Sequence, residues 1–176
     1  MTKKILTFGA SSSKNSINKQ LATYTANQFK NVSIEILDLN DYEMPIFSID
    51  KEKENGIPQL AHDFYAKLGS ADLILISFAE HNGAYSTAFK NIFDWASRIN
   101  GKTFQEKPML LLATSPGARG GSSVLEIAKN RFPFQGGIVK GSFSLPSFND
   151  NFDSEKGITN DELKKQLLEI VNSIEL

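Results

Sequence analysis

Cysteine is absent from the sequence, and histidine occurs only at His62 and His81. The lack of cysteine excludes disulfide bonds and thiolate metal sites, and two histidines leave little material for a zinc or haem site. The formal net charge is only −1, and no run of Lys and Arg forms a basic stripe. Because nucleic-acid binding relies on clustered cations that neutralise phosphates, the composition argues against a nucleic-acid partner.

Long hydrophobic runs are also missing. No apolar segment approaches the roughly 20 residues that a membrane-spanning helix needs. The N-terminus, Met1–Ile5, enters a short strand pattern rather than a signal-peptide core. We therefore expect a cytoplasmic protein with no membrane partner. Because no linker, repeat or low-complexity segment divides the chain, we predict a single domain over residues 1–176.

Hydrophobic runs that predict strands alternate with periodic patterns that predict helices. The predicted strands are Lys4–Phe8, Val32–Leu37, Asp72–Phe78, Pro108–Thr114 and Ile138–Leu145. The predicted helices are Ile17–Lys30, Pro58–Leu68, Tyr85–Ile99, Ser123–Arg131 and Asn160–Ile174. The runs 73–76 and 109–113 are apolar at every position, as in parallel strands that are covered on both faces. We therefore predict an α/β fold, a doubly wound sheet of five parallel strands with helices on both faces.

Smaller features mark helix starts and loops. Ser123–Glu126 and Thr159–Glu162 both have the spacing of a capping box, in which a Ser or Thr precedes the helix and a Glu follows three residues later. The stretches Asn40–Ile57 and Pro146–Gly157 lack a clear pattern, and we expect them to be irregular.

The turns after the first, third and fourth predicted strands are expected to converge, because ligands of doubly wound sheets bind beyond the carboxyl ends of the strands. The first turn, Gly9–Asn18, is rich in serine and runs into a helix. Free N–H groups at a helix N-terminus, together with the helix dipole, favour an anion such as phosphate. Alternatively, Ser16 is only a helix cap and the other serines are solvated.

The second turn, Ser77–Tyr85, follows the third predicted strand. It contains a carboxylate, an imidazole, an amide and a glycine, and backbone groups around glycine can approach a flat ligand closely. The Asn82-Gly83 pair also suits a positive-φ turn, so the segment can equally be a simple entry to the next helix. The aromatic residues of that helix are more typical of a core or a subunit interface than of a cofactor contact.

The third turn, Ser115–Ser122, holds three glycines and a proline. It can form a flat wall against a ring system, with Arg119 available to a second, anionic ligand. The alternatives are a loop shaped only for the entry to the next helix, and Arg119 as an ordinary surface residue.

Together, the three turns predict a site for a mononucleotide with a large planar head, and FMN fits this description. The sequence has neither the Gly-x-x-x-x-Gly-Lys-Ser/Thr loop of nucleoside triphosphate sites nor the Gly-x-Gly-x-x-Gly loop of dinucleotide sites.

These residues resemble the NAD(P)H-dependent FMN reductases of the flavodoxin-like fold, a family that includes azo dye and quinone reductases. Ser16–Asn18 matches the end of the family's phosphate turn, Gly-Ser-x-Arg-x-x-Ser-x-Asn. Ala79–Ala84 corresponds to the flavin-ring turn Pro-Glu-Tyr-Asn-Gly-Ser, and Phe89–Trp95 to the helix motif Leu-Lys-Asn-Ala-Ile-Asp-Trp. Ser115–Gly121 follows the Ser-Pro-Gly and Gly-Gly pattern, and Asp38–Pro45 resembles the loop after the family's second strand.

The resemblance implies the strand order 2-1-3-4-5 and a binding site for FMN. The residues implied for its phosphate are Ser11, Ser13, Ser16, Ile17 and Asn18. The residues implied for its ring, chiefly through backbone groups, are Ala79, Glu80, His81, Asn82 and Gly83. The residues implied to close the pocket are Ser115, Gly117, Gly120 and Gly121.

Three positions depart from the family pattern. Ser13 stands where the family often has arginine, which leaves the compensation of phosphate charge to hydroxyls, amides and Lys14. Ala79 and His81 replace proline and tyrosine beside the flavin. His81 either modulates the flavin through a partial charge near neutral pH or is a passive wall.

The implied activity is an oxidoreductase that passes hydride from NADPH or NADH to bound FMN, and then reduces a small flavin, quinone or azo acceptor in a ping-pong cycle. This cycle needs no catalytic side chain or metal, because the chemistry belongs to the cofactor. The resemblance also implies a homodimer or homotetramer built on the helix Tyr85–Ile99.

Two alternatives remain. One is a flavodoxin-type electron carrier, for which we expect a threonine-rich phosphate turn and a strongly acidic surface, neither of which this sequence has. The other is a flavin-free binding protein on the same fold.

Overall fold

The five predicted strands form one parallel sheet in a computed structural model, which describes residues 2–176. The strands of this sheet are β1 (Lys3–Ala10), β2 (Val32–Ile36), β3 (Leu73–Phe78), β6 (Lys107–Thr114) and β7 (Gly137–Leu145). They run parallel in the order β2-β1-β3-β6-β7. This order confirms the expected arrangement 2-1-3-4-5 and brings the ends of β1, β3 and β6 together in the middle of one edge.

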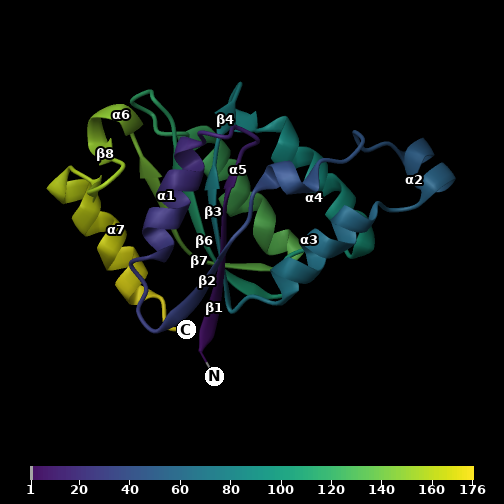
Figure 1. Ribbon diagram of the computed structural model, residues 1–176, viewed down its shortest axis with the longest axis horizontal. Coiled ribbons are helices and arrows are strands. Elements are labelled where there is room, and N and C mark those ends of the chain that lie inside the picture. Colours follow the sequence, from purple (N-terminus) through teal and green to yellow (C-terminus); the bar gives the residue numbers. More distant parts are fainter. Residues whose placement is uncertain (1) are drawn as a thin grey trace.

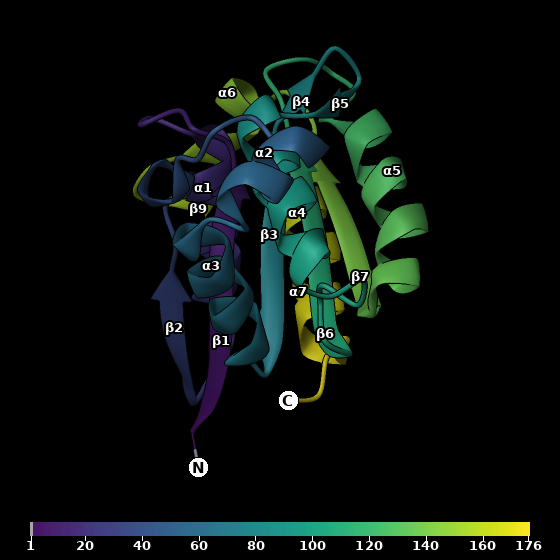
Figure 2. The same cartoon turned by 90° about the vertical axis from the view of Figure 1, so that its right-hand side faces the viewer.

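Helices cover both faces of the sheet, as expected (Figure 1). One face packs against α1 (Ile17–Ala26) and α7 (Asp161–Ser173), and the other against α3 (Gln59–Gly69), α4 (Thr87–Ile99) and α5 (Ser122–Arg131). Figure 2 shows α3 and α4 in front of the strands, α5 at the right beside β7, and α1 and α7 behind. Successive side chains of a strand point to opposite faces, and the central strands therefore contribute to two separate hydrophobic cores.

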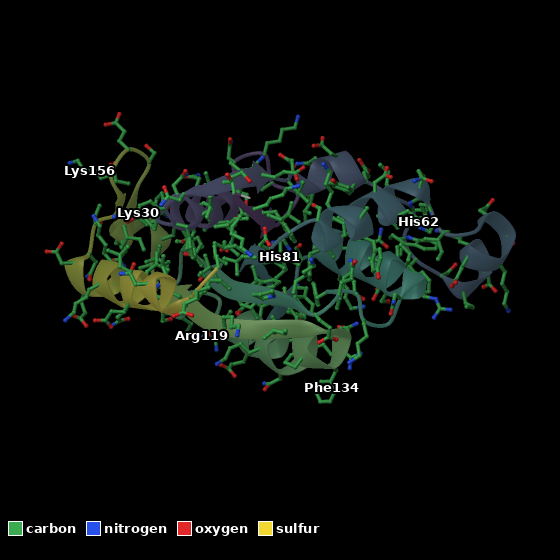
Figure 3. All side chains as sticks on the ribbon, turned by 90° about the horizontal axis from the view of Figure 1, so that it is seen from below. Lys30, His62, His81, Arg119, Phe134 and Lys156 are labelled. Carbon is green, nitrogen blue, oxygen red and sulfur yellow. The ribbon has the colours of Figure 1, made fainter. Side chains whose placement is uncertain are left out.

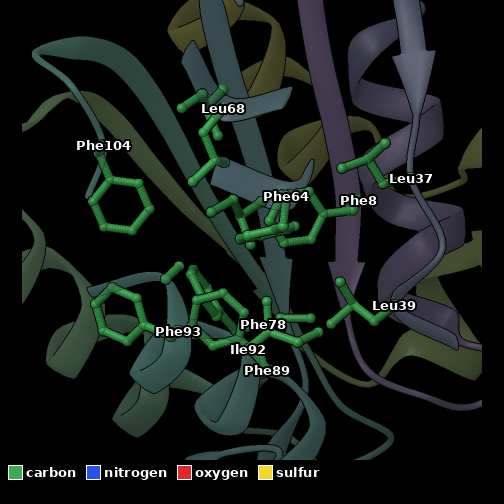
Figure 4. Packing of buried hydrophobic residues seen from close by; sticks show 14 of the residues in the cluster. Phe8, Leu37, Leu39, Phe64, Leu68, Phe78, Phe89, Ile92, Phe93 and Phe104 are labelled. Carbon is green, nitrogen blue, oxygen red and sulfur yellow. The ribbon is translucent and has the colours of Figure 1, made fainter. Parts of the chain in front are cut away.

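An aromatic cluster fills the core under α3, α4 and α5 (Figure 4). Phe89 of α4 packs edge-on against Phe78 of β3, and their ring centroids are 5.5 Å apart. Phe93 and Trp95 of α4 are also buried, and Trp95 is only 1% exposed. The aromatic residues of α4 therefore stabilise the chain's own core, and a partner subunit could meet only the outer face of this helix.

The two stretches that were expected to be irregular contain short elements. Within 40–57 lie part of η1 (Leu39–Tyr42) and all of α2 (Ile49–Asn55). Within 146–157 lie α6 (Phe148–Asn151), β8 (Phe152–Asp153) and the start of β9 (Gly157–Ile158). No residue of α2 is buried, so this helix has no hydrophobic periodicity by which the sequence could reveal it. Figure 1 shows α2 standing out from the body of the molecule.

The helix predictions are correct within two residues at each end, except that α1 ends at Ala26 rather than Lys30. The side chains of Thr25 and Asn27 donate hydrogen bonds to the carbonyls of preceding residues and so compete with a continuing helix. Just beyond the helix, Asn31 adopts a left-handed conformation with φ of 58°. These local hydrogen bonds end α1 although its sequence pattern continues.

Both predicted capping boxes are wrong. Asn160, not Thr159, caps α7 and accepts a hydrogen bond from the Leu163 amide at 3.1 Å. Before α5 stands Gly121, in a left-handed conformation and without a side chain, so Ser123 lies inside the helix. The N-terminus of α5 therefore needs a cap from elsewhere in the chain.

Across residues 2–176, no helix combines the length and the apolar character that crossing a membrane requires.

Candidate functional site

The turns after β1, β3 and β6 meet at the carboxyl edge of the sheet and line one hollow of about 250 Å³. This hollow brings together most of the predicted site residues, namely Ser11, Ser13, Ser16, Ile17, Asn18, Ala79, Glu80, His81 and Ser115. It also includes Asn15, Thr114 and Pro116, which the sequence had not singled out. Five predicted residues lie outside its lining, and these are Asn82, Gly83, Gly117, Gly120 and Gly121.

The first turn presents mainly hydrogen-bond donors. The Oγ atom of Ser16 caps α1 by accepting from the Lys19 amide at 3.1 Å, as the cap interpretation predicted. The Oγ atom of Ser11 accepts from the Ser13 amide, also at 3.1 Å. Within residues 2–176, the amides of Ile17 and Asn18 at the start of α1 have no acceptor. Free amides and hydroxyls at a helix start suit an anion.

Asn18 uses its side chain for the fold rather than for the hollow. The residue is only 2% exposed. Its Nδ2 atom donates to the Thr114 carbonyl at 3.1 Å, and its Oδ1 atom accepts from the Thr114 amide at 3.1 Å and from Ser77 Oγ at 2.7 Å. This side chain therefore fixes the start of α1 above β3 and β6, and only the backbone N–H of Asn18 remains for a ligand.

The second turn is a short hairpin, formed by β4 (Glu80–His81) and β5 (Ala84–Tyr85). Asn82 and Gly83 stand at its tip with φ values of 52° and 76°, as expected for a tight Asn-Gly turn. The hairpin projects beyond the strand ends (Figure 1). This position explains why Asn82 and Gly83 do not line the hollow, although His81 does.

Two contacts anchor the base of this hairpin. Tyr85 packs against the ring of Phe89 with centroids 5.2 Å apart, and burial raises the pKa of its phenol well above the usual range. Ser86, the cap of α4, donates from Oγ to the Ala10 carbonyl at 2.8 Å. The hairpin is therefore joined to the end of β1, where the first turn begins.

Glu80 provides the cap that α5 lacks. Its Oε2 atom accepts from the Val124 amide at 3.0 Å, and its Oε1 atom lies 3.8 Å from Nη2 of Arg119. The Glu80 side chain is 13% exposed, whereas Arg119 is 77% exposed and lies at the outer surface (Figure 3). A carboxylate at a helix N-terminus is favoured by the helix dipole. The Glu80 side chain thus links the second turn to the third.

The glycines of the third turn are required by packing. Gly120 and Gly121 have positive φ values of 55° and 74°. A Cβ atom on Gly120 would lie 2.5 Å from Ser144 Oγ and 2.8 Å from the Leu145 backbone. Gly117 accepts hydrogen bonds from the amides of Gly120 and Ser147 at 3.1 and 3.0 Å. These contacts fix the turn against the end of β7, which agrees with the loop-shaping alternative.

Few cations lie near the first turn. Lys19 pairs with Asp38 at 2.6 Å, and hydrogen bonds from Lys19 and from the Asn40 amide hold the pKa of Asp38 below its usual value. Lys14 is exposed and forms no ion pair within the described part of the chain. In residues 2–176, no cluster of three or more His, Asp or Glu side chains could hold a metal ion.

Two residues of the α4 motif have a role that the sequence did not reveal. Asn91 accepts from the Phe47 amide at 2.8 Å and donates to the carbonyls of Met44 and Pro45. Trp95 donates from its indole N–H to the Pro45 carbonyl at 2.8 Å. These side chains hold the segment 44–47 against α4. The motif was the only sequence signal for these two residues, and it does not reveal which distant residues they contact.

Comparison with known proteins agrees with this arrangement. The sequence pattern of the family described as NADPH-dependent FMN reductase matches residues 3–150. An uncharacterized protein of Mycoplasma pneumoniae is 31% identical over 164 residues, which are 90% of this chain and 96% of that protein. The NADPH:quinone oxidoreductase of Arabidopsis thaliana is 29% identical over 147 residues, which are 82% of this chain and 74% of that protein.

The fold is likewise shared with solved structures. FerB from Paracoccus denitrificans, described as a flavoenzyme NAD(P)H:(acceptor) oxidoreductase, superposes with a TM-score of 0.76. The alignment covers 97% of this chain and 94% of FerB at 22% identity, which supports a shared flavodoxin-like fold. The match of the family's sequence pattern to residues 3–150 shows family membership in addition to the fold. This chain belongs to the NADPH-dependent FMN reductase family, whose members are NAD(P)H-dependent flavin and quinone oxidoreductases.

Proposed function

We propose that this protein binds FMN at the carboxyl edge of its sheet and uses NADPH or NADH to reduce a small acceptor, of which a quinone is the best supported. The observation behind this proposal is that the three turns line one hollow, with a donor-rich helix start at one end. The names of the quinone oxidoreductases among the relatives support the acceptor class.

The donor set of the first turn fits a phosphate. We propose that the hydroxyls of Ser11, Ser13 and Ser16 and the amides of Ile17 and Asn18 bind it. These groups can all donate hydrogen bonds, and the turn places no carboxylate among them. Because Lys19 is paired with Asp38, the phosphate is held mainly by hydrogen bonds and the helix dipole.

The second and third turns fit the planar end of the ligand. We propose that Ala79, Glu80 and His81 border one side of the ring and Ser115 the other, chiefly through backbone groups. In this proposal Asn82 and Gly83 shape the hairpin, while Gly117, Gly120 and Gly121 shape the third turn. The contact between Glu80 and α5 keeps the two turns at a fixed separation.

When bound, FMN supplies the redox chemistry, accepting a hydride from NADPH or NADH and then passing two electrons to an acceptor that takes up two protons. The protein's part is to bind the phosphate, orient the ring and leave one ring face open to the two substrates in turn. We assign no side chain as a general acid or base, because hydride transfer to a flavin requires none.

We also propose that the protein is a homodimer or homotetramer. The buried aromatic residues of α4 cannot form the interface. The remaining surface includes the outer face of α4, where Lys90 and Asp94 pair at 2.7 Å, and the neighbouring segment 44–49. Ile46 and Ile49 of that segment are 69% and 48% exposed. A subunit contact over this segment would bury both isoleucines against an apolar surface of the partner.

A spectroscopic experiment tests the function. FMN is added to the purified chain, bound flavin is measured by the change in its visible spectrum, and NADPH or NADH is then added without oxygen. We expect the flavin band to bleach, and a quinone added next to restore it. If flavin binds but neither nucleotide bleaches it, the protein is an electron carrier instead. If no flavin binds, the proposal is wrong.

A further inference from the structure

A second and larger hollow, of about 690 Å³, lies beside the proposed flavin site. One wall is the exposed side of α1, and the other is the hairpin formed by β8 and β9. The two hollows share Asn15 and Ser16 at the start of α1. Apart from residues 14–16, the two walls have no role in the flavin site as described above. We call this hollow the α1 groove.

Aromatic rings form the inner part of the α1 groove. Tyr24 of α1 and Phe152 of β8 meet edge to face, with centroids 5.6 Å apart and planes at 86°. Phe152 is itself stacked on Phe148 at 4.7 Å, which fixes its orientation. Gly157 lies so close to Tyr24 that any side chain there would overlap the Tyr24 ring. The hairpin is therefore built to lie against this ring and so to form the second wall.

The rim of the α1 groove is positively charged. Lys14 stands at the end near the flavin site. Lys156 stands on the loop of the hairpin (Figure 3). Neither lysine forms an ion pair within residues 2–176. The carboxylate of Asp153 accepts from the amides of Glu155 and Lys156, both at 2.9 Å, and thereby fixes the backbone that bears Lys156. Only one carboxylate, that of Glu155, lines the groove.

Aromatic rings with a cationic rim match the chemistry of a nucleotide, a flat base joined to phosphates. Tyr24 lies eight positions after Ser16, which is at the shared wall, a distance of about 12 Å along the helix. A molecule that reaches both hollows must therefore be extended, and Lys14 beside the shared wall favours a negative charge in its middle. A dinucleotide has this form, since a pyrophosphate joins its two nucleosides.

We propose that the α1 groove binds the adenosine phosphate end of the nicotinamide dinucleotide, with the base against Tyr24 and Phe152 and the phosphates near Lys14 and Lys156. This inference rests on the proposed function, which places the nicotinamide end at the flavin. It assigns the recognition of the co-substrate to residues that do not line the hollow of the three turns.

The first test uses the double variant Lys14→Ala/Lys156→Ala with FMN added, in anaerobic rapid-mixing measurements of flavin reduction. We expect the NADPH concentration for half-maximal rate to rise about tenfold, with an unchanged limiting rate, because the lysines bind the co-substrate without touching the reacting atoms. Lys30→Ala, at an exposed lysine outside the groove, is the matched control and should behave like the unmodified chain (Figure 3).

The second test is a calorimetric titration of the full chain, with FMN added, by adenosine 2′,5′-bisphosphate. We expect saturable binding that the double variant weakens about tenfold and the Lys30→Ala variant leaves unchanged. Absence of saturable binding, or equal affinity in the double variant, would overturn the inference.

The two proposals fail in different ways. If NADPH bleaches the flavin equally well in all variants, the proposed function stands and the groove assignment is wrong. If no flavin binds, the proposed function is wrong, and the titration still reports whether the α1 groove accepts an adenosine phosphate.

Discussion

Ser16 stands at the boundary between the fold and the proposed ligand. Its Oγ atom accepts from the Lys19 amide and so caps α1, while the residue also lines the hollow of the three turns. Helix caps and phosphate sites draw on the same free amides, so the two interpretations of this serine that the sequence offered are compatible.

A negative charge at position 16 distinguishes the helix cap from the phosphate site. Ser16→Asp should leave the fold intact, because aspartate caps helices as well as serine does. It should weaken FMN binding by at least about 100-fold, because a carboxylate would stand beside the phosphate in a partly desolvated site. Fluorescence titration of FMN measures the affinity.

Ser16→Asn is the matched control, since asparagine is an equally good cap of similar size without the charge. It should reduce the affinity far less than Ser16→Asp does. Equal FMN affinities for the Asp and Asn variants would show that the phosphate does not bind at this helix start.

Asn18 shows what the sequence could and could not reveal at this scale. Its position in the first turn follows from the motif, but its side chain bonds to Ser77 and Thr114, which are 59 and 96 residues away along the chain. No local pattern names such partners. The motif placed Asn18 at the end of the first turn, where it lines the hollow, and only the fold determined which of its atoms are free for a ligand.

At the scale of secondary-structure elements, the start of α5 depends on a distant side chain. Gly121 offers no cap, and Glu80 from the second turn accepts from the Val124 amide instead. The sequence suggested Ser123 and Glu126 as a capping box because it could only show spacing along the chain. Local spacing cannot reveal a cap that comes from a residue 44 positions earlier in the chain.

Removal of the Glu80 side chain should destabilise both the start of α5 and the position of the second turn. Glu80→Ala should lower the free energy of unfolding by about 1–2 kcal/mol, the usual cost of a lost helix cap, and should also weaken FMN binding. Glu80→Gln should lower the free energy of unfolding by less, because the amide oxygen can still accept a hydrogen bond from the Val124 amide. Urea unfolding followed by circular dichroism measures the first effect, and flavin titration the second.

Glu126→Ala is the control, since Glu126 is an exposed glutamate of α5 that pairs with Lys129 on the helix surface. It should change stability by no more than about 0.5 kcal/mol. If Glu80→Ala were no more destabilising than Glu126→Ala, the contact with Val124 would have no role in joining the two turns.

Secondary-structure prediction succeeded for elements whose burial produces a hydrophobic pattern in the sequence, and it failed for elements without such a pattern. The central strands were identified because the runs 73–76 of β3 and 109–113 of β6 are buried on both faces and are therefore apolar at every position. The helix α2 was missed because it buries nothing. The hairpin after β3 was foreseen only as a turn, since each of its strands has just two residues.

For the whole molecule, the topology decided more about the site than any motif did. The order β2-β1-β3-β6-β7 places the ends of β1, β3 and β6 side by side, so their turns must share one edge. The expected position of the site followed from this order. The α1 groove did not, because its second wall is a hairpin within a stretch of sequence without pattern.

The subunit arrangement belongs to this scale as well. The sequence suggested that the aromatic helix meets a partner, but its aromatic residues are packed inside the chain. Asn91 and Trp95 instead hold the segment 44–47 in place from within. The interface we propose therefore includes the segment that Asn91 and Trp95 hold against α4. Ile46 is the most exposed apolar side chain of this segment.

A charge at Ile46 tests this interface. The unmodified chain should sediment as a dimer or tetramer in analytical ultracentrifugation, and Ile46→Asp should weaken association at least about tenfold, because the carboxylate would be buried without a partner. Ile127→Asp, on the exposed side of α5, is the control, since that side chain is 40% exposed but lies outside the proposed interface. Dissociation by Ile127→Asp rather than Ile46→Asp would move the interface to α5, and a monomeric unmodified chain would exclude it.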